Sequence, residues 1–190
     1  MTTVLVTRLT SAAKTANVTR AATAAANAVA MSMGSAATTV PAIKRKMMNG
    51  HMPKGHPDHS KEAFEELVEK ASRLVEQLGL HFRVSKLAAG DCSASMARTY
   101  DVELWIPSMG IYKECSSVSN ANDYQARRNN TRFRDGETGK PRFVHTLNGS
   151  GLATSRLIPA IVEQFQNADG SVTIPEVLRK YMGGMEKITK

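Results

Sequence analysis

Three stretches of this sequence gather residue types that could do chemistry on charged oxygen atoms. Glu114 is followed by the hydroxyls of Ser116 and Ser117, and all three supply hard oxygen atoms. Ser150 lies between two glycines, and Arg156 follows that turn, where a guanidinium can engage phosphate oxygens and stack on a base. Taken singly, such residues are more often an ordinary strand acid, turn hydroxyl or helix cation than parts of a site, so the residue types alone favour a structural role.

A helix and several short strands must position these residues. In 61–79 apolar residues recur at three- and four-residue steps, which predicts an amphipathic helix that Ser60 caps and Gly79 ends. Four β-rich runs separated by glycines and prolines predict strands at 81–87, 100–106, 111–118 and 142–147. A second helix is expected over about 152–166, with Pro159 inside it, and a short segment over 175–181. The short connections favour an α+β fold, an antiparallel sheet with helices against one face.

The motif stretches together resemble a known family. The segments 99–107, 112–128 and 144–156 look like the second half of the catalytic domain of seryl-tRNA synthetases, which are class II aminoacyl-tRNA synthetases. The likeness runs in order from about Lys61 to Ile188. It implies a partial class II catalytic domain whose cofactors are ATP and Mg²⁺ and whose partner is tRNA-Ser.

The resemblance also implies roles for individual residues. Arg156 corresponds to the arginine that contacts ATP, Ser150 to the hydroxyl that recognises serine, and Glu114 with Ser117 to the magnesium ligands. The implied ATP-binding residues are Glu114, Cys115, Ser116, Ser117 and Arg156. On a regular strand Glu114 and Ser117 would point to opposite faces, so their shared role implies a bulge or twist at 115–117.

Parts of the family's site have no counterpart before Lys61. Motif 1, the Thr-x-Glu loop for the serine ammonium group, the motif 2 arginine and the tRNA-gripping helical hairpin are not visible in the sequence. We therefore expect a truncated form that does not adenylate serine alone, and whose open sheet edge needs a second protein chain. Two alternatives stay open: a non-catalytic paralogue serving as a structural or regulatory subunit, and a tRNA-binding module. The second would use the basic run Arg127, Arg128, Arg132, Arg134, Lys140 and Arg142.

The excess positive charge of the chain is concentrated at its N-terminus. Of the 25 basic residues, seven lie in 1–57, which contains no acid, so residues 58–190 hold 18 basic against 17 acidic residues. The Ala/Thr/Ser-rich, acid-free segment 1–40 predicts a disordered organellar presequence, most simply for the mitochondrial matrix, with a plastid as the alternative. Residues 41–60 are interpreted as a linker and 61–190 as the catalytic half.

Composition excludes a membrane-spanning protein and a disulfide-stapled scaffold, and sets aside a histidine metal site. No apolar run approaches the ~18 residues that cross a bilayer, and two cysteines cannot staple a chain of 190 residues. His51, His56 and His59 are interpreted as solvated loop histidines, because no cysteine accompanies them and no helix sets their spacing.

Overall fold

The computed structural model describes residues 56–189. The predicted presequence (1–40) and most of the predicted linker (41–60) lie outside this part of the chain and stay predictions. The described elements are η2 (Pro57–His59), α4 (Ser60–Gln77), β1 (Phe82–Lys86), β2 (Arg98–Ile106), β3 (Ile111–Asn120), α5 (Tyr124–Arg128), β4 (Arg132–Arg134), β5 (Pro141–Phe143), β6 (Leu147–Gly149), α6 (Thr154–Gln164), β7 (Val172–Thr173), α7 (Glu176–Arg179), η3 (Lys180–Met182) and β8 (Lys187–Ile188).

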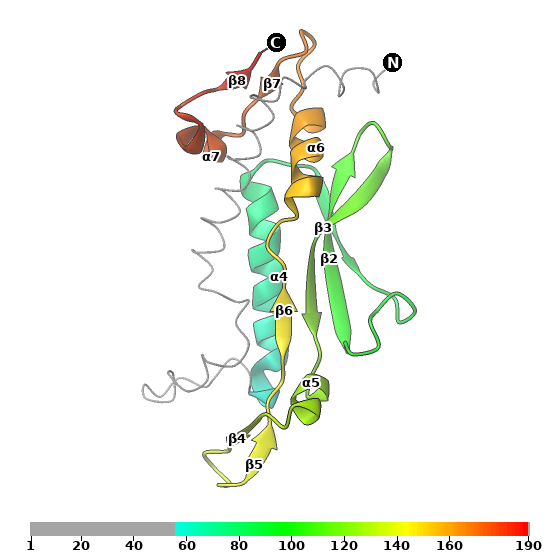
Figure 1. The fold of residues 1–190 in the computed structure, drawn as a ribbon, viewed down its shortest axis with the longest axis vertical. Helices are drawn as coiled ribbons and strands as arrows, with labels where there is room; N and C mark the ends of the chain where they lie inside the picture. The colour runs from blue at the N-terminus through cyan, green and yellow to red at the C-terminus, as the bar shows by residue number, and fades with distance from the viewer. Residues whose placement is uncertain (1–55, 190) are drawn as a thin grey trace.

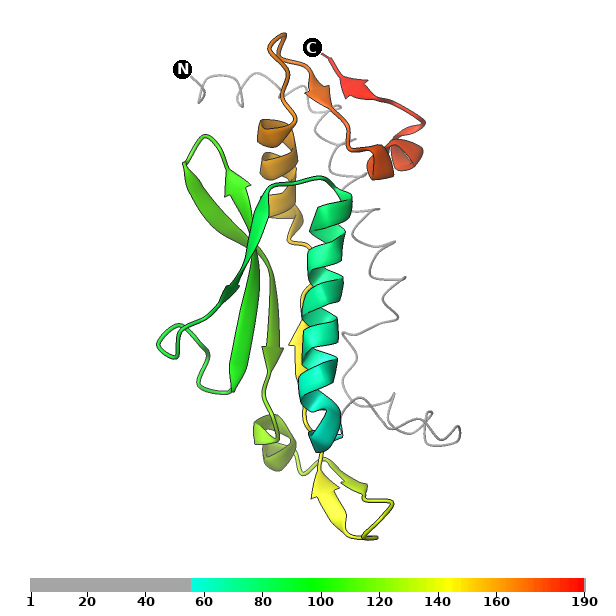
Figure 2. The same ribbon diagram turned by 180° about the vertical axis from the view of Figure 1, so that it is seen from behind.

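A four-stranded antiparallel sheet in the order β1-β2-β3-β6 forms the centre of this fold. Helices α4 and α6 run beside the long β2–β3 hairpin, as Figures 1 and 2 show from opposite sides. Both helices contribute buried side chains to the same apolar cluster as β2 and β3, so they cover one face of the sheet. The predicted α+β architecture is therefore confirmed.

The apolar stripe of α4 faces that sheet, as its three- and four-residue spacing predicts. Phe64 and Val75 have no exposed surface, and the Phe64 ring meets the Tyr100 ring edge-on at a centroid distance of 5.2 Å. From the sheet, Val102 and Leu104 are fully buried in the same cluster. Because alternate strand residues share a face, the odd-numbered residues of β2 point to the opposite side of the sheet.

The ends of α4 differ in how well local sequence predicted them. Gly79 follows the helix with a φ of +69°, a left-handed conformation that ends helices and favours glycine. The predicted cap at Ser60 is wrong: Ser60 is the first helical residue, and its hydroxyl lies 3.0 Å from the Pro57 carbonyl and 2.7 Å from His145 Nδ1. Because the turn η2 leads directly into α4, the helix begins at Ser60, one residue before its predicted start.

The predicted strand over 142–147 is also wrong. That run is split into β5, which pairs with β4, and β6, which joins the main sheet beside β3. Between them the Val144 side chain is buried with Ala126 and Phe133 in a second, smaller apolar cluster. The run therefore serves two separate cores, which strand propensity alone does not distinguish.

His56 departs from the solvated state expected for it. Its side chain is buried, its ring packs on Phe133 at a centroid distance of 5.0 Å, and its Nδ1 accepts a hydrogen bond from the Asp58 amide. His59 remains exposed, as predicted, while His51 lies outside the described residues. His56 therefore helps to attach the start of α4 to the β4–β5 hairpin.

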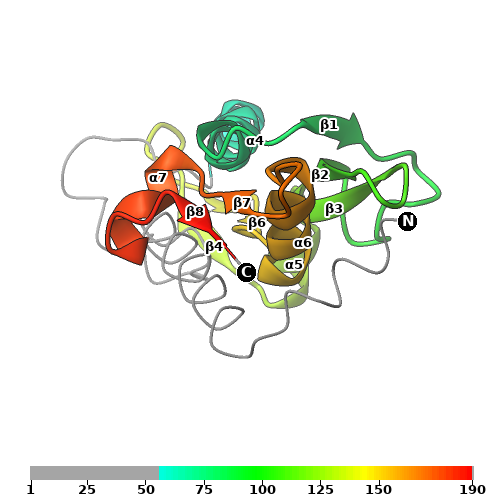
Figure 3. The ribbon, with the colours of Figure 1, turned by 90° about the horizontal axis from the view of Figure 1, so that it is seen from above.

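The predicted second helix is present with shorter bounds, and the short segment expected after it is helical. Helix α6 covers 154–164 and keeps Pro159 beyond its first turn, on its exposed side. The segment expected over 175–181 forms α7 and η3. Seen from above in Figure 3, β7, α7 and β8 lie on the side of α6 away from β2 and β3. No described helix is long and apolar enough to cross a membrane.

Candidate functional site

A β-bulge in β3 brings Glu114 and Ser117 to one face of the sheet. Ser116 pairs with Val102 but Glu114 pairs with Glu103, so two steps along β3 match one step along β2 and Cys115 is the extra residue. Ser117 then pairs with Asp101, two residues before Glu103 and on the same face of β2. The bulge that the resemblance implied at 115–117 is thereby confirmed.

This register arranges polar side chains in rows across the face opposite the helices. One row runs Arg83, Glu103 and Glu114, and the next runs Ser85, Asp101 and Ser117. Ser150 continues the second row, because its amide donates to the Ser117 carbonyl at 3.0 Å, just beyond the end of β6. A third row, His81, Trp105 and Tyr112, places the only tryptophan of the chain at one end of this face.

The two residues between Glu114 and Ser117 point elsewhere. Cys115 and Ser116 are 2% and 0% exposed, and the Ser116 hydroxyl donates to the Ser150 carbonyl at 2.7 Å. Burial raises the pKa of the Cys115 thiol to about 11. Their predicted part in ATP binding can therefore involve their backbone but not their side chains, which are occupied in packing and in holding β6.

Ser150 is held by β3 in a defined orientation. Its hydroxyl oxygen accepts a hydrogen bond from the Ser117 amide at 2.9 Å. Its own proton has only long contacts, 3.4 Å to Ser116 Oγ and 3.4 Å to the Ser117 carbonyl oxygen. The side chain is exposed, so a ligand hydroxyl can compete for that proton.

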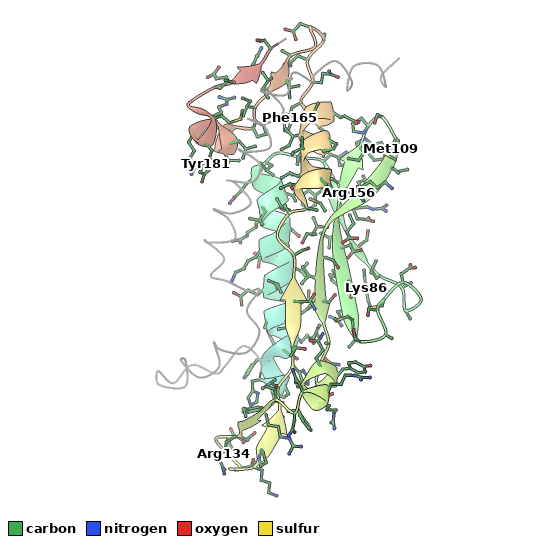
Figure 4. The ribbon with its side chains drawn as sticks, viewed as in Figure 1. Lys86, Met109, Arg134, Arg156, Phe165 and Tyr181 are labelled. Atoms are coloured by element: carbon green, nitrogen blue, oxygen red, sulfur yellow. The ribbon has the colours of Figure 1, made fainter. Side chains whose placement is uncertain are left out.

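Arg156 lies in the first turn of α6, beside the bulge. The Ala153 amide donates to the Cys115 carbonyl at 2.8 Å, which fixes the start of the helix against β3. Figure 4 shows Arg156 between α6 and the β2–β3 hairpin. Its charge reaches the Glu114 carboxylate, whose pKa it acts to lower. The side chain is exposed and has no ion pair among residues 56–189.

Two acids of the site, Asp101 and Glu103, were missed from sequence. Glu103 is neutralised: Arg83 Nε lies 2.5 Å from its Oε2 and Ser85 Oγ donates at 2.7 Å. Partial burial acts to raise the pKa of Glu103, but these hydrogen bonds outweigh it and the net shift is downward. Asp101 is different, because it is only 7% exposed and its Oδ1 has no hydrogen-bond partner in the described residues.

The acids affect one another as well. Desolvation and the neighbouring charges of Asp101 and Glu103 raise the pKa of Glu114, whereas Arg156 opposes the shift. Crowded carboxylates of this kind favour binding of a positive charge. Glu114 and Ser117 supply the hard oxygen atoms that suit Mg²⁺, and the orphaned oxygen of Asp101 lies in the same pair of rows. The described residues contain no group of three or more His, Cys, Asp or Glu side chains that could enclose a metal by themselves.

The basic run around α5 and the β4–β5 hairpin is a separate feature. Arg142 bridges Asp135 at 2.8 Å and Asp58 at 3.2 Å, and Arg127 pairs with Asp123 at 2.8 Å. Figure 4 shows Arg134, in the same hairpin, toward the opposite end of the molecule from Phe165 and distant from Arg156. Two of the six basic residues are thus paired with acids, and the hairpin that carries Arg134 lies away from the Glu114 site.

A comparison with known protein families matches residues 46–165 to the tRNA synthetase class II core domain of the G, H, P, S and T enzymes. Among curated proteins, the chain is 59% identical over 149 residues to serine–tRNA ligase 2 of Clostridium acetobutylicum, covering 75% of this chain and 35% of that protein. It is 56% identical over 131 residues to the serine–tRNA ligase of Anaeromyxobacter sp. strain K, covering 69% and 30%.

Solved structures show the same relationship. The seryl-tRNA synthetase of Pyrococcus horikoshii complexed with ATP matches with a TM-score of 0.67 and 44% identity, over 71% of this chain and 30% of that one. The cytoplasmic serine–tRNA ligase of Naegleria fowleri in complex with AMP matches with a TM-score of 0.64 and 35% identity, over 70% and 32%.

These matches cover only part of each relative. The chain spans about a third of the length of the curated relatives it matches. The family model nevertheless covers more than half of the chain, including β1, β2, β3, β6 and α6, which together carry the site. The chain therefore belongs to the class II tRNA synthetase core-domain family and is a homologue of the serine–tRNA ligases.

Proposed function

We propose that this chain forms the part of a serine–tRNA ligase that binds ATP, Mg²⁺ and serine. The observation that carries the proposal is the bulge at Cys115, which places Glu114 and Ser117 on one face. Ser150 adjoins them through the Ser117 amide, and Arg156 is near enough to act on the charge of Glu114. An acid, two hydroxyls and a guanidinium thus converge from three separate segments.

This set suits the formation of a serine adenylate. In that reaction a carboxylate oxygen of serine bonds to the α-phosphorus of ATP, the bond to the bridging oxygen breaks, and pyrophosphate leaves with its electrons. Arg156 would contact phosphate oxygens and balance their charge, which lowers the cost of charge build-up. When bound, Mg²⁺ would neutralise the phosphates further, and Glu114 with Ser117 would hold it.

Ser150 is the candidate for substrate selection. Since its oxygen already accepts from the Ser117 amide, its proton can be offered to the hydroxyl of bound serine. A polar site of this kind rejects an analogue without the hydroxyl, because a polar group would then be left unpaired. We expect it to distinguish serine from alanine.

Binding to the purified full chain tests the proposal. Trp105, the only tryptophan, lies on the site face and reports ligands through its fluorescence. We expect saturable quenching by Mg²⁺-ATP, and L-serine to bind the ATP-loaded chain at least about tenfold more tightly than L-alanine. Ser150→Ala should remove that preference, whereas Ser108→Ala, on the exposed turn after β2, should keep it. No quenching by ATP, or equal binding of serine and alanine, would contradict the proposal.

The complete reaction is proposed to need a second protein chain. The described sheet ends at β1 on one side and at the short β6 on the other, and the sequence shows no motif 2 arginine. In this proposal the partner supplies the remaining adenylation groups and helps to present tRNA-Ser. Serine-dependent pyrophosphate exchange by the purified chain alone would contradict this part.

We also propose that residues 1–40 direct the chain to the mitochondrial matrix. The support is compositional: cations are spaced through an acid-free, Ala/Thr/Ser-rich segment. A fluorescent protein fused behind residues 1–60 should accumulate in mitochondria, and the same fusion with Arg8, Lys14 and Arg20 changed to glutamate should remain in the cytosol. Accumulation of the unaltered fusion in plastids, or failure of both fusions to enter an organelle, would refute this destination.

A further inference from the structure

Asp101 is the buried acid of the site face, and its carboxylate has no ion pair in the described residues. It is 93% buried, because 7% of its surface is exposed, and its Oδ1 is sealed from solvent without a hydrogen-bond partner. No ion pair to it is present among residues 56–189. A carboxylate in this state destabilises the folded protein, so its presence calls for a ligand that compensates the charge.

The position of Asp101 indicates which ligand that is. Its strand partner across the sheet is Ser117, and Glu114 lies in the adjoining row on the same face. Two acids and a hydroxyl that approach one another from neighbouring strands form an oxygen-rich, negatively charged setting, which suits a small divalent cation.

Glu103 shows by contrast why Asp101 is singled out. It lies two residues along β2 on the same face, but Arg83 and Ser85 bind its carboxylate and neutralise its charge. The two acids of β2 on this face therefore have different roles. The Glu103 carboxylate is satisfied by contacts within the sheet, whereas the Asp101 carboxylate has no such contact.

We infer that Asp101 is a positioning residue for the divalent cation of the site, supplying the second negative charge beside Glu114 and Ser117. The inference rests on the proposed function and deepens it, because it adds a third group to the cation site. Asp101 would draw the cation toward the sheet and orient its water ligands through the accessible side of its carboxylate. Groups of this kind commonly change metal affinity by about 10- to 100-fold.

The test uses the full chain and Mn²⁺, whose free form is counted by electron paramagnetic resonance, with and without ATP. Asp101→Asn should weaken Mn²⁺ binding at least about tenfold while raising the melting temperature of the metal-free protein, since it removes a buried unbalanced charge. The matched control, Glu103→Gln, should change Mn²⁺ affinity less than about twofold and should lower the melting temperature, because Arg83 loses its partner.

The opposite signs of the two effects separate a cation role from a purely structural one. Unchanged Mn²⁺ affinity in Asp101→Asn would overturn the inference while leaving the proposed function intact. An equal loss in Glu103→Gln would also overturn it, since net charge alone would then explain the effect. If the unaltered chain bound Mn²⁺ neither alone nor with ATP, the proposed ATP and magnesium site would itself be wrong, and the role of Asp101 with it.

Discussion

Changing Arg156 to alanine is expected to weaken Mg²⁺-ATP binding by about 10- to 100-fold. Hydrogen bonds to charged groups contribute about 1.5–3 kcal/mol each, and a guanidinium can form two to a phosphate. Arg156 is exposed at the start of α6, makes no ion pair within residues 56–189, and acts on the charge of Glu114. Its loss therefore removes charge directed at the ligand without removing a packing contact of the core. Trp105 fluorescence titrated with Mg²⁺-ATP measures the change.

Two further variants sharpen that measurement. Arg156→Lys keeps the charge but not the planar pair of donors, so we expect an intermediate affinity. Arg98→Ala removes another partly exposed arginine, which pairs with Glu65 at 2.9 Å near the start of β2, and should leave ATP affinity unchanged. An Arg156→Ala protein that binds ATP within twofold of the original would exclude a phosphate role.

Deleting Cys115 is expected to weaken Mg²⁺-ATP binding about tenfold while Mn²⁺ binding is kept. Without the extra residue, the pairing of β3 with β2 becomes regular, and Glu114 and Ser117, then two residues apart, stay opposite Glu103 and Asp101 on one face. The deletion removes the Cys115 carbonyl that accepts from the Ala153 amide at 2.8 Å, and so frees the start of α6, which carries Arg156. Mn²⁺ binding by electron paramagnetic resonance without ATP, and Trp105 fluorescence titrated with Mg²⁺-ATP, measure the two effects.

Cys115→Ala is the matched control for that deletion. It removes only the sulfur of this side chain, which is 2% exposed, and keeps the extra residue that forms the bulge. Its cost is the loss of one buried sulfur, about 1 kcal/mol, with cation binding retained. A deletion variant that folds and binds Mg²⁺-ATP as tightly as Cys115→Ala would show that the contact of Ala153 with the Cys115 carbonyl does not position Arg156.

The bulge also shows how much of the site could be predicted. From strand geometry alone, Glu114 and Ser116 share a face and Ser117 does not. The family resemblance required Glu114 and Ser117 together, and only a local irregularity satisfies both, so its position could be inferred before the register was known. The register shift at Val102/Glu103 lies where that conflict placed it.

Asp101 could not be identified in the same way. In sequence it is one of several polar residues that alternate with apolar ones in β2, and this pattern is typical of any half-exposed strand. What distinguishes it from Glu103 is how β1 is used: Arg83 and the Ser85 hydroxyl both bind Glu103, although Ser85 is the strand partner of Asp101. Which residues of neighbouring strands lie opposite one another is set by the tertiary structure and cannot be read from a single sequence.

The failed predictions have related causes. The strand expected over 142–147 divides because Val144 is drawn into the small Phe133 cluster, while Leu147 continues in the main sheet. The cap expected at Ser60 fails because η2 precedes it and His145 lies 2.7 Å from its hydroxyl. In both places contacts from distant parts of the chain outweigh local propensity.

The backbone between β6 and α6 is fastened to β3 at two points, Ser150 to the Ser117 carbonyl and Ala153 to the Cys115 carbonyl. The segment that carries the candidate serine hydroxyl and the arginine consequently has little freedom to move as an independent loop. Any displacement of β3 at the bulge is transmitted to both groups at once. Glu114, Ser117, Ser150 and Arg156 are thus held in one fixed arrangement. Closure around a ligand therefore has to come from protein on the other side of the ligand.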